Sequence, residues 1–189
     1  MSLEVVKYGH PALRQKGARI EKITPEIKKF IGEMLLTMED YHGVGLAAQQ
    51  VGQALQLAVI DVRATDRPST LWLDGKPADP ATLMPLVLIN PEVKPAAEPV
   101  AGGEGCLSFP EIFSEITRPE QVHVTCTNTK GERISFRCGG LFARAVQHEV
   151  DHLNGILFID RMESKDKREL QLELEVLQTE TKAALKRKK

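Results

Sequence analysis

The first long pattern of hydrophobic and polar positions has the period of an α-helix. From Ile27 to Met38 the hydrophobic residues recur three and four positions apart, which places them along one helix face. Thr24 before Pro25 is a typical helix start, because threonine caps free backbone amides and proline suits the first helical position. We therefore predict a helix that begins near residue 25, packs its apolar face on the core and ends before His42, which is exposed or caps the helix.

Two hydrophobic runs further along the chain predict β-strands. They are "LQLAVIDV" at residues 55–62 and "PLVLINPEV" at residues 85–93. The segment between them, residues 63–82, is polar and rich in proline, with a turn signal at Asp74 and Gly75. We predict a loose edge hairpin around residues 71–73 in this long excursion.

The clearest hairpin is "VHVTCTNTKGERISFRC" at residues 122–138. Apolar residues alternate along both arms, and Lys130 and Gly131 supply the turn. Cys126 and Cys138 fall on the apolar positions, so we interpret them as small buried hydrophobic residues rather than metal ligands. His123 falls out of phase with that face and is predicted to be exposed.

A second helix is predicted between two glycines at 139–140 and the Asn154–Gly155 pair, which is a typical helix end. One face of this helix is wholly apolar, a second carries two histidines and a glutamate, and a narrow third is polar. The polar third consists of Arg144, Gln147 and Asp151. A helix that is apolar over so much of its circumference is central in a fold, so its histidines should be buried and need partners.

From about residue 164 the chain is charged, with leucines on one stripe, and it ends in "LKRKK". This pattern predicts a surface helix that packs one edge on the body of the protein and then frays. The stripe consists of Leu170, Leu174, Leu177 and Leu185. No internal repeat or domain boundary is visible, so we predict one domain over residues 1–189 with a helical, basic tail at about 164–189.

Composition narrows the classes of function. The net charge of −1 over 189 residues gives no electrostatic argument for nucleic-acid binding. No apolar run is long enough to span a bilayer, and the first residues lack the pattern of a signal peptide. Three cysteines without paired spacing do not make a disulfide framework. We therefore expect a protein of the reducing cytoplasm.

The strongest chemical signal is "HEVDH", which lies on the predicted central helix. His148 and His152 are four residues apart, so both imidazoles project from the same helix face. Glu149 lies about 100° around the helix, near enough to act on a molecule bound there. This is the spacing of the H-E-x-x-H metal hydrolases, which use two histidine ligands and a glutamate as general base.

A catalytic site of this kind needs a third protein ligand. The downstream histidine of one protease class is absent, because Phe158 stands at its position, and nothing distinguishes the glutamates at 163, 169 and 173. Cys106 in "GGEGCLSFP" is a better candidate, since thiolate binds zinc or ferrous iron strongly. From these residues alone, Cys106 as a buried hydrophobic residue or as a covalent nucleophile stays open.

Three short motifs resemble, in order, the signature motifs of the peptide deformylase family. They are "GVGLAAQQ" at residues 43–50, "EGCLS" at 104–108 and "QHEVDH" at 147–152. The resemblance implies an α+β fold in which antiparallel sheets wrap around a central helix that carries the histidines, with an additional C-terminal helix. It also implies metal-dependent removal of the formyl group from the N-terminal formyl-methionine of nascent chains, with release of formate.

The resemblance assigns roles to individual residues. The implied metal ligands are Cys106, His148 and His152, and the ion is Fe²⁺ in the cell, with Zn²⁺, Ni²⁺ or Co²⁺ as replacements. Glu149 is the implied general base and acid, while the Gln50 side chain and the Leu107 backbone N–H bind the formyl oxygen. Gln49 falls at a position that is variable in the family.

The resemblance further implies that the peptide substrate binds as an added strand between the first motif and the glycine-rich run before the cysteine. The expected substrate-binding residues, including an apolar pocket for methionine, are Gly43, Val44, Gly45, Gly103, Glu104, Gly105, Leu141 and Ala145. Two features depart from the family pattern. The excursion at residues 63–82 is long, and Phe113 stands where a basic residue is common.

Two rival functions have distinguishable consequences. A cysteine amidohydrolase with Cys106 as nucleophile would leave Glu149 without a role and would resist chelators. A non-catalytic metal-binding module would need a fourth ligand of similar quality, which the sequence does not offer. The sequence leaves open whether the basic tail makes a transient contact with the ribosome.

Overall fold

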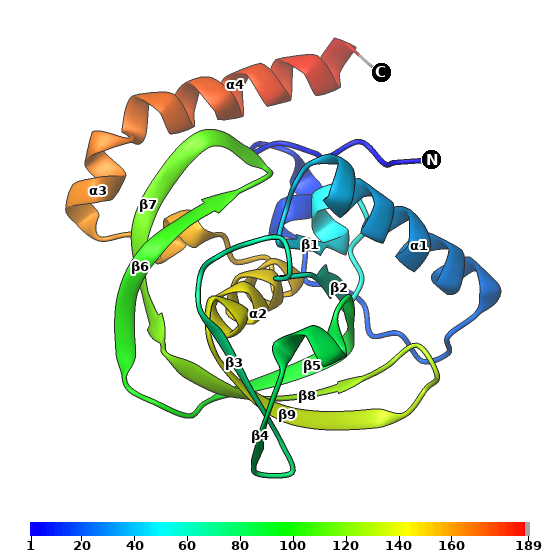
Figure 1. The fold of residues 1–189 in the computed structure, drawn as a ribbon. Coiled ribbons are helices and arrows are strands. Elements are labelled where there is room, and N and C mark those ends of the chain that lie inside the picture. The colour runs from blue at the N-terminus through cyan, green and yellow to red at the C-terminus, as the bar shows by residue number, and fades with distance from the viewer. Residues whose placement is uncertain (188–189) are drawn as a thin grey trace.

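The computed structural model describes residues 1–187, which form both helices and strands (Figure 1). The helices are α1 (Pro25–Asp40), α2 (Leu141–Leu153), α3 (Ser164–Glu169) and α4 (Gln171–Arg187). The strands are β1 (Gly45–Ala47), β2 (Leu57–Ile60), β3 (Ser69–Leu73), β4 (Lys76–Ala78), β5 (Leu86–Pro95), β6 (Pro99–Cys106), β7 (Phe109–Pro119), β8 (Gln121–Thr127) and β9 (Arg133–Gly140). Short 3₁₀ turns lie at Pro11–Arg14, Ala48–Val51, Pro80–Leu83 and Phe158–Asp160.

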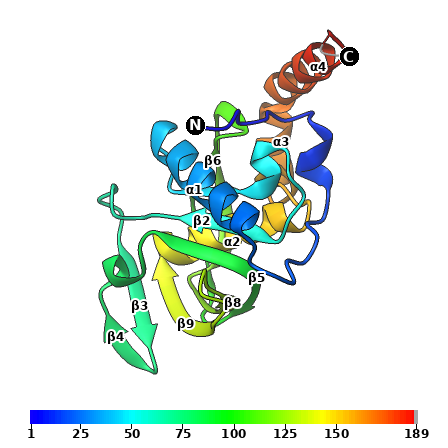
Figure 2. The ribbon, with the colours of Figure 1, turned by 90° about the vertical axis from the view of Figure 1, so that its right-hand side faces the viewer.

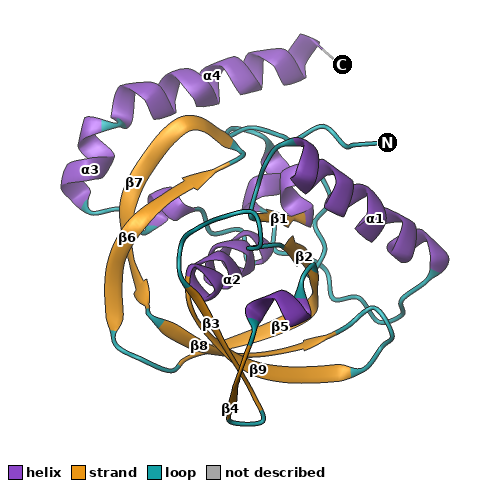
Figure 3. Ribbon diagram, viewed as in Figure 1, coloured by secondary structure: helices purple, strands orange, loops and turns teal. Residues whose placement is uncertain are grey.

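Two antiparallel sheets surround α2. Seven strands follow the order β1-β2-β5-β8-β9-β3-β4, and β6 pairs with β7 in a separate two-stranded sheet. Helix α2 contacts strands of both sheets and lies at the centre of the molecule (Figures 1 and 3). This arrangement confirms the predicted α+β fold with a central helix.

Helix α2 is central because its apolar face is buried in the hydrophobic core. Phe142, Val146 and Leu153 are fully buried and belong to the largest hydrophobic cluster, together with residues of β2, β5, β8 and β9. Gly140 precedes the helix with φ of 66°, a conformation that favours glycine and lets the chain turn sharply out of β9. The predicted boundaries of this helix are confirmed.

Helix α1 contacts β1 and β2 and lies on the side of β2 away from α2 (Figure 2). The Thr24 side chain accepts a hydrogen bond from the Ile27 N–H, as its predicted role as a cap requires. The buried positions Ile31, Met34 and Met38 follow the predicted stripe and pack in a second cluster beside the strands. His42 is exposed, with φ of 54°.

The predicted hairpins are also present. In β8 and β9, Cys126 and Cys138 are buried among hydrophobic residues, and His123 is exposed. In the excursion at residues 63–82, β3 and β4 form a hairpin whose turn at Asp74 and Gly75 has positive φ at both positions. Because β3 also pairs with β9, the excursion extends the large sheet.

Two features were not predicted. Strands β6 and β7 form a long hairpin, and the glycines of β6 obscure the strand pattern there. The tail forms two helices, because the chain departs from helical geometry at Leu170 between α3 and α4. Leu174 is buried and Leu170 and Leu177 pack beside it, which agrees with the predicted stripe. The last two lysines of the basic tail lie outside the described residues.

Candidate metal centre

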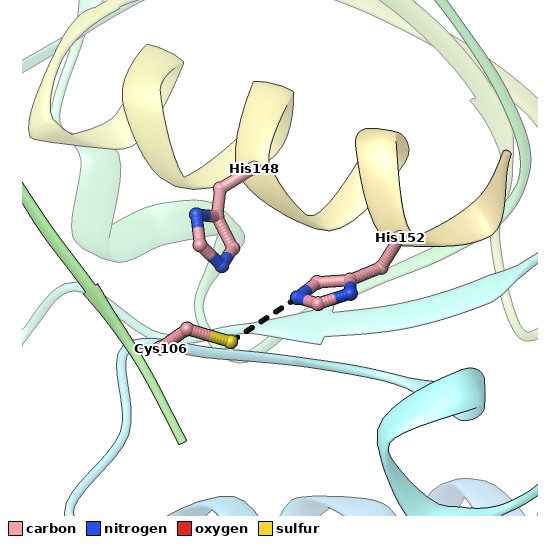
Figure 4. Close-up of side chains that lie close together, drawn as sticks. All are labelled: Cys106, His148 and His152. Carbon is pink, nitrogen blue, oxygen red and sulfur yellow. Dashed lines mark hydrogen bonds between the residues drawn. The ribbon is translucent and has the colours of Figure 1, made fainter. Parts of the chain in front are cut away.

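Three ligand atoms converge from two elements of the fold. The Cys106 side chain comes from the end of β6, and His148 and His152 come from successive turns of α2 (Figure 4). One ligand atom from each residue lies within 4.8 Å of the others, and Cys106 Sγ is 3.3 Å from His152 Nε2. A single ion can therefore contact all three side chains.

The position of Cys106 follows from the hairpin that carries it. The register of β6 against β7 shifts between Gly105 and Cys106, and Leu107 and Ser108 form the turn that follows. Such irregularities redirect the side chain at the end of a strand. The sulfur faces α2 (Figure 4), while the Leu107 residue lines the same cavity from the turn.

The His148 ring is oriented by a buried carboxylate. Its Nδ1 donates a hydrogen bond to Glu104 Oε2 over 3.0 Å, which leaves Nε2 for the shared point near Cys106. Burial alone would raise the pKa of Glu104, but hydrogen bonds from His148 and Arg118 outweigh it and lower the pKa to about 2. Glu104 is therefore ionised at neutral pH and holds the ring in one tautomer.

Glu104 belongs to a buried ionic network below the histidines. Arg118 is only 3% exposed and donates to Glu104 over 2.5 Å and to Asp151 over 2.8 Å. Arg144 also donates to Glu104, and Arg161 donates to Asp151. Arg144 and Asp151, which lie on the polar face of α2, are thus buried and form ion pairs. Periodicity had identified their face but not its surroundings.

His152 is the most enclosed of the three candidate ligands, with 1% of its surface exposed. Burial, followed by the neighbouring His148, lowers its pKa well below the usual value, so the ring is neutral and keeps a lone pair for a metal. One thiolate sulfur and two imidazole nitrogens are the donor set of known catalytic zinc sites and are suitable for ferrous iron. The residues present therefore fit a catalytic metal ion.

Glu149 lies beside this group in a place that only a neighbouring glycine leaves free. A Cβ atom at Gly45 would collide with Glu149 Oε1, so the bare backbone of β1 admits the carboxylate. Oε2 of Glu149 is buried and has no hydrogen-bond partner among residues 1–187. Burial raises the pKa of Glu149 to about 7, which suits a group that both accepts and donates a proton.

Gln50 is held with its amide group toward Cys106. Its Oε1 accepts a hydrogen bond from the Ala47 N–H over 2.8 Å, so its Nε2 lies 3.4 Å from Cys106 Sγ. The neighbouring Gln49 has a different environment, because its Nε2 donates to the Gln15 carbonyl. Only Gln50 thus presents a donor to the metal centre, although both side chains are buried.

A cavity of about 680 Å³ opens above these residues. All the residues predicted to bind substrate line it: Gly43, Val44, Gly45, Gly103, Glu104, Gly105, Leu141 and Ala145. Gln50, Cys106, Leu107, His148 and Glu149 line it as well. The Glu104 carboxylate, however, accepts hydrogen bonds from His148 and from arginines, so this residue orients a candidate metal ligand in addition to lining the cavity.

Comparison with known proteins gives the family. The sequence model of the family described as polypeptide deformylase matches residues 2–168. The chain is 42% identical over 188 residues to a peptide deformylase of Opitutus terrae, and the match covers 98% of both chains. It is 44% identical over 175 residues to a peptide deformylase of Methylacidiphilum infernorum, which covers 93% of this chain and 92% of that one. The chain belongs to the polypeptide deformylase family.

The fold agrees with this membership. It matches the crystal structure of a peptide deformylase from Synechococcus elongatus in complex with actinonin with a TM-score of 0.75 and 37% identity, covering 95% of this chain and 85% of that one. Among the described residues, no helix is both long and apolar enough to cross a membrane.

In this deformylase the three sequence motifs line one cavity, although they lie far apart in the chain. Sequence reasoning missed Arg118, whose strand carries no motif and whose charge alone gives no sign of burial. It also missed Arg67, which reaches the cavity from the excursion. Phe113 lines the cavity with 70% of its surface exposed, and its ring lies against Gly105.

Proposed function

We propose that this cavity removes the formyl group from the N-terminal formyl-methionine of nascent polypeptides, by metal-dependent hydrolysis. Family membership gives the deformylase activity and its dependence on a metal. The observation that carries the assignment of residues is the convergence of Cys106, His148 and His152 beside the buried carboxylate of Glu149. We propose that these three side chains hold the ion.

We propose Fe²⁺ as the ion in the cell, with Zn²⁺, Ni²⁺ or Co²⁺ able to replace it. A mixed sulfur and imidazole donor set supports this choice, since it suits all of these ions. When bound, such an ion supplies a Lewis acid that makes water a nucleophile near neutral pH. The protein side chains supply the remaining steps.

Glu149 is the proposed proton carrier. Glu149 lines the cavity, and its Oε2, which has no hydrogen-bond partner among residues 1–187, is the proposed acceptor of a proton from the attacking water. The same carboxyl group then donates that proton to the amine of methionine as formate leaves. A pKa of about 7 supports both transfers, because neither protonation state is strongly favoured. Proton transfer of this kind contributes about 10²–10⁴-fold to rates.

Gln50 and Leu107 are the proposed donors to the oxygen of the formyl group. The Gln50 Nε2 group is fixed by the bond that its Oε1 accepts from Ala47, so little reorganisation is needed when charge develops. Leu107 presents its backbone N–H from the turn after β6. Both donors act on the oxygen that becomes negative during attack.

Two unpaired strand edges support the proposed peptide site. Among the described residues, β1 has a partner only in β2 and β6 has a partner only in β7. Residues from both strands line the cavity, so an extended peptide can pair with main-chain groups on each side. The apolar side chains of Val44, Leu141 and Ala145 then surround methionine.

We propose that the enzyme acts in the cytoplasm, where formylated chains emerge.

Lys186 and Arg187 are exposed at the end of α4 and support a transient contact with the ribosome. Ribosome cosedimentation of the full chain and of a variant with both residues changed to glutamate tests this contact.

One observation also favours the cysteine amidohydrolase. Cys106 Sγ and His152 Nε2 are 3.3 Å apart, the distance of a nucleophile and its base. Formate release from formyl-Met-Ala-Ser, measured anaerobically with and without a chelator, separates the two functions. We expect the chelator to abolish release and Fe²⁺ to restore it, whereas a cysteine nucleophile would be unaffected.

A second substrate tests the specificity of the site. N-acetyl-Met-Ala-Ser adds one methyl group where the formyl hydrogen lies, and a closely packed site excludes it sterically. We expect kcat/KM to be at least about a hundredfold lower for the acetyl peptide, which corresponds to about 2.7 kcal/mol. Comparable values would show a general deacylase and contradict the proposal.

A further inference from the structure

The connection between β2 and β3 brings a guanidinium group to the cavity. Leu141, the first residue of α2, donates its N–H to the Pro68 carbonyl over 2.9 Å and so fixes the end of this connection. The preceding residue, Arg67, lines the cavity and donates from Nη1 to the Gly103 carbonyl over 3.2 Å. The excursion thus contacts Leu141 of the proposed methionine pocket through Pro68 and the edge of β6 through Arg67.

The charge of Arg67 is not neutralised by the protein. Arg67 is exposed, and no carboxylate of residues 1–187 lies within ion-pair distance of it. Arg144, which also lines the cavity, is buried and paired with Glu104. Arg63, on the same connection, is paired with Asp61 and does not line the cavity. Arg67 is therefore a cation available to a bound peptide.

Lys7 is another exposed cation of the cavity, but it lies on a different side. Its neighbours Val6 and Tyr8 donate backbone hydrogen bonds to the Gln50 and Ser108 carbonyls. Lys7 thus belongs to the wall near the formyl end of the site, whereas Arg67 lies at Gly103, upstream along β6.

The register of β6 indicates which substrate residue meets Arg67. If the peptide pairs with β6 as proposed above and its formyl group lies at Cys106, the end of that strand, then it runs antiparallel to β6 and places methionine opposite Gly105. Each residue advances about 3.3 Å along a strand, so the third residue of the peptide lies opposite Gly103. Side chains alternate along a strand, and the third one points to the same side as methionine, toward Leu141 and the Arg67 connection.

We propose that Arg67 is a specificity-determining residue that binds a carboxylate on the third residue of the formylated peptide. This inference rests on the proposed function and deepens it. Guanidinium groups bind carboxylates through paired, charge-assisted hydrogen bonds, which are stronger than the single bond to the Gly103 carbonyl. Arg67 exchanges that carbonyl for the substrate carboxylate, and the Gly103 carbonyl becomes free to accept from the peptide main chain.

The test compares formyl-Met-Ala-Glu-Ser with the isosteric peptide that has glutamine at the third position, using the Fe²⁺ enzyme under anaerobic conditions. We expect kcat/KM to be about fivefold higher for the glutamate peptide, mainly through KM, as for a partly exposed charged pair. The preference should disappear in Arg67→Gln and decrease at about 0.5 M salt. Arg63→Gln and Lys7→Gln should retain it.

Several outcomes would overturn the inference. They are equal kcat/KM for both peptides in the wild type, a preference that survives in Arg67→Gln, and a preference that is lost in Lys7→Gln. An equal decrease on both peptides in Arg67→Gln would show a main-chain contact and also contradict a carboxylate site. Failure of the proposed function is distinguishable, because neither peptide would then release formate.

Discussion

Glu104 Oε2 and His148 Nδ1 are joined by a 3.0 Å hydrogen bond that links the metal centre to the buried ionic network. Glu104 is on β6, two residues before Cys106, while His148 is on α2. One strand thus provides a candidate metal ligand and also orients another on the central helix. The bond couples the position of β6 to the direction of the imidazole.

Glu104→Gln should weaken metal binding by about 10–100-fold, the usual effect of losing a carboxylate that supports a histidine ligand. The amide cannot carry the negative charge that fixes the tautomer of His148. Competition with a chromogenic chelator measures the affinity. Glu111→Gln is the matched control, because Glu111 is exposed and lines the same cavity. Unchanged affinity in Glu104→Gln would show that the bond does not support the ligand.

Glu149→Gln should retain the metal and lose turnover by about 10²–10⁴-fold, because the three ligands remain while the proton carrier is removed. Elemental analysis and formate release on the same preparation separate the two effects. If the metal were lost together with activity, Glu149 would be a ligand and not a base.

Cys106→Ala should release the metal or greatly weaken its binding, since two imidazoles alone hold an ion poorly. Cys126→Ala is the control. That side chain is equally small and is buried, but it lies in the β8–β9 hairpin away from the ligand group. Its loss should lower the melting temperature and leave the metal content unchanged. Normal metal content in Cys106→Ala would refute the proposed ligand set.

Gln50→Ala should leave the metal content unchanged and reduce kcat by about 10²–10³-fold, the usual effect of removing one oxyanion donor. Gln49→Ala is the matched control, because it removes a neighbouring buried amide that bonds to the Gln15 carbonyl instead. A loss below about tenfold in Gln50→Ala would exclude the proposed role.

Periodicity predicted those helices and strands whose buried positions follow a local pattern of hydrophobic residues. The stripe from Ile31 to Met38 and the alternation around Cys126 and Cys138 are local patterns, and both are buried as expected. The β6–β7 hairpin was missed because the glycines of β6 carry no hydrophobic signal, and β6 is the strand with which β7 pairs.

In the candidate site too, some residues could be identified from the sequence and others only from the fold. Motif spacing was enough to nominate both histidines. Thiolate chemistry made Cys106 a candidate, and only the resemblance to the family gave it the role of third ligand. It was not enough for Arg118, because a buried arginine and a surface arginine look alike in sequence. Its role follows only from the carboxylates that the fold places around it, Glu104 and Asp151.

Gly45 and Gly103 both line the cavity, yet they should differ in mutational tolerance. A methyl group at Gly103 meets no atom within 4 Å, so alanine has room there. A methyl group at Gly45 enters the space of the Glu149 carboxylate and must displace it. A position with no side chain thus limits where the proposed proton carrier can lie. Inactivating substitutions can therefore arise at a residue that takes no part in proton transfer or metal binding.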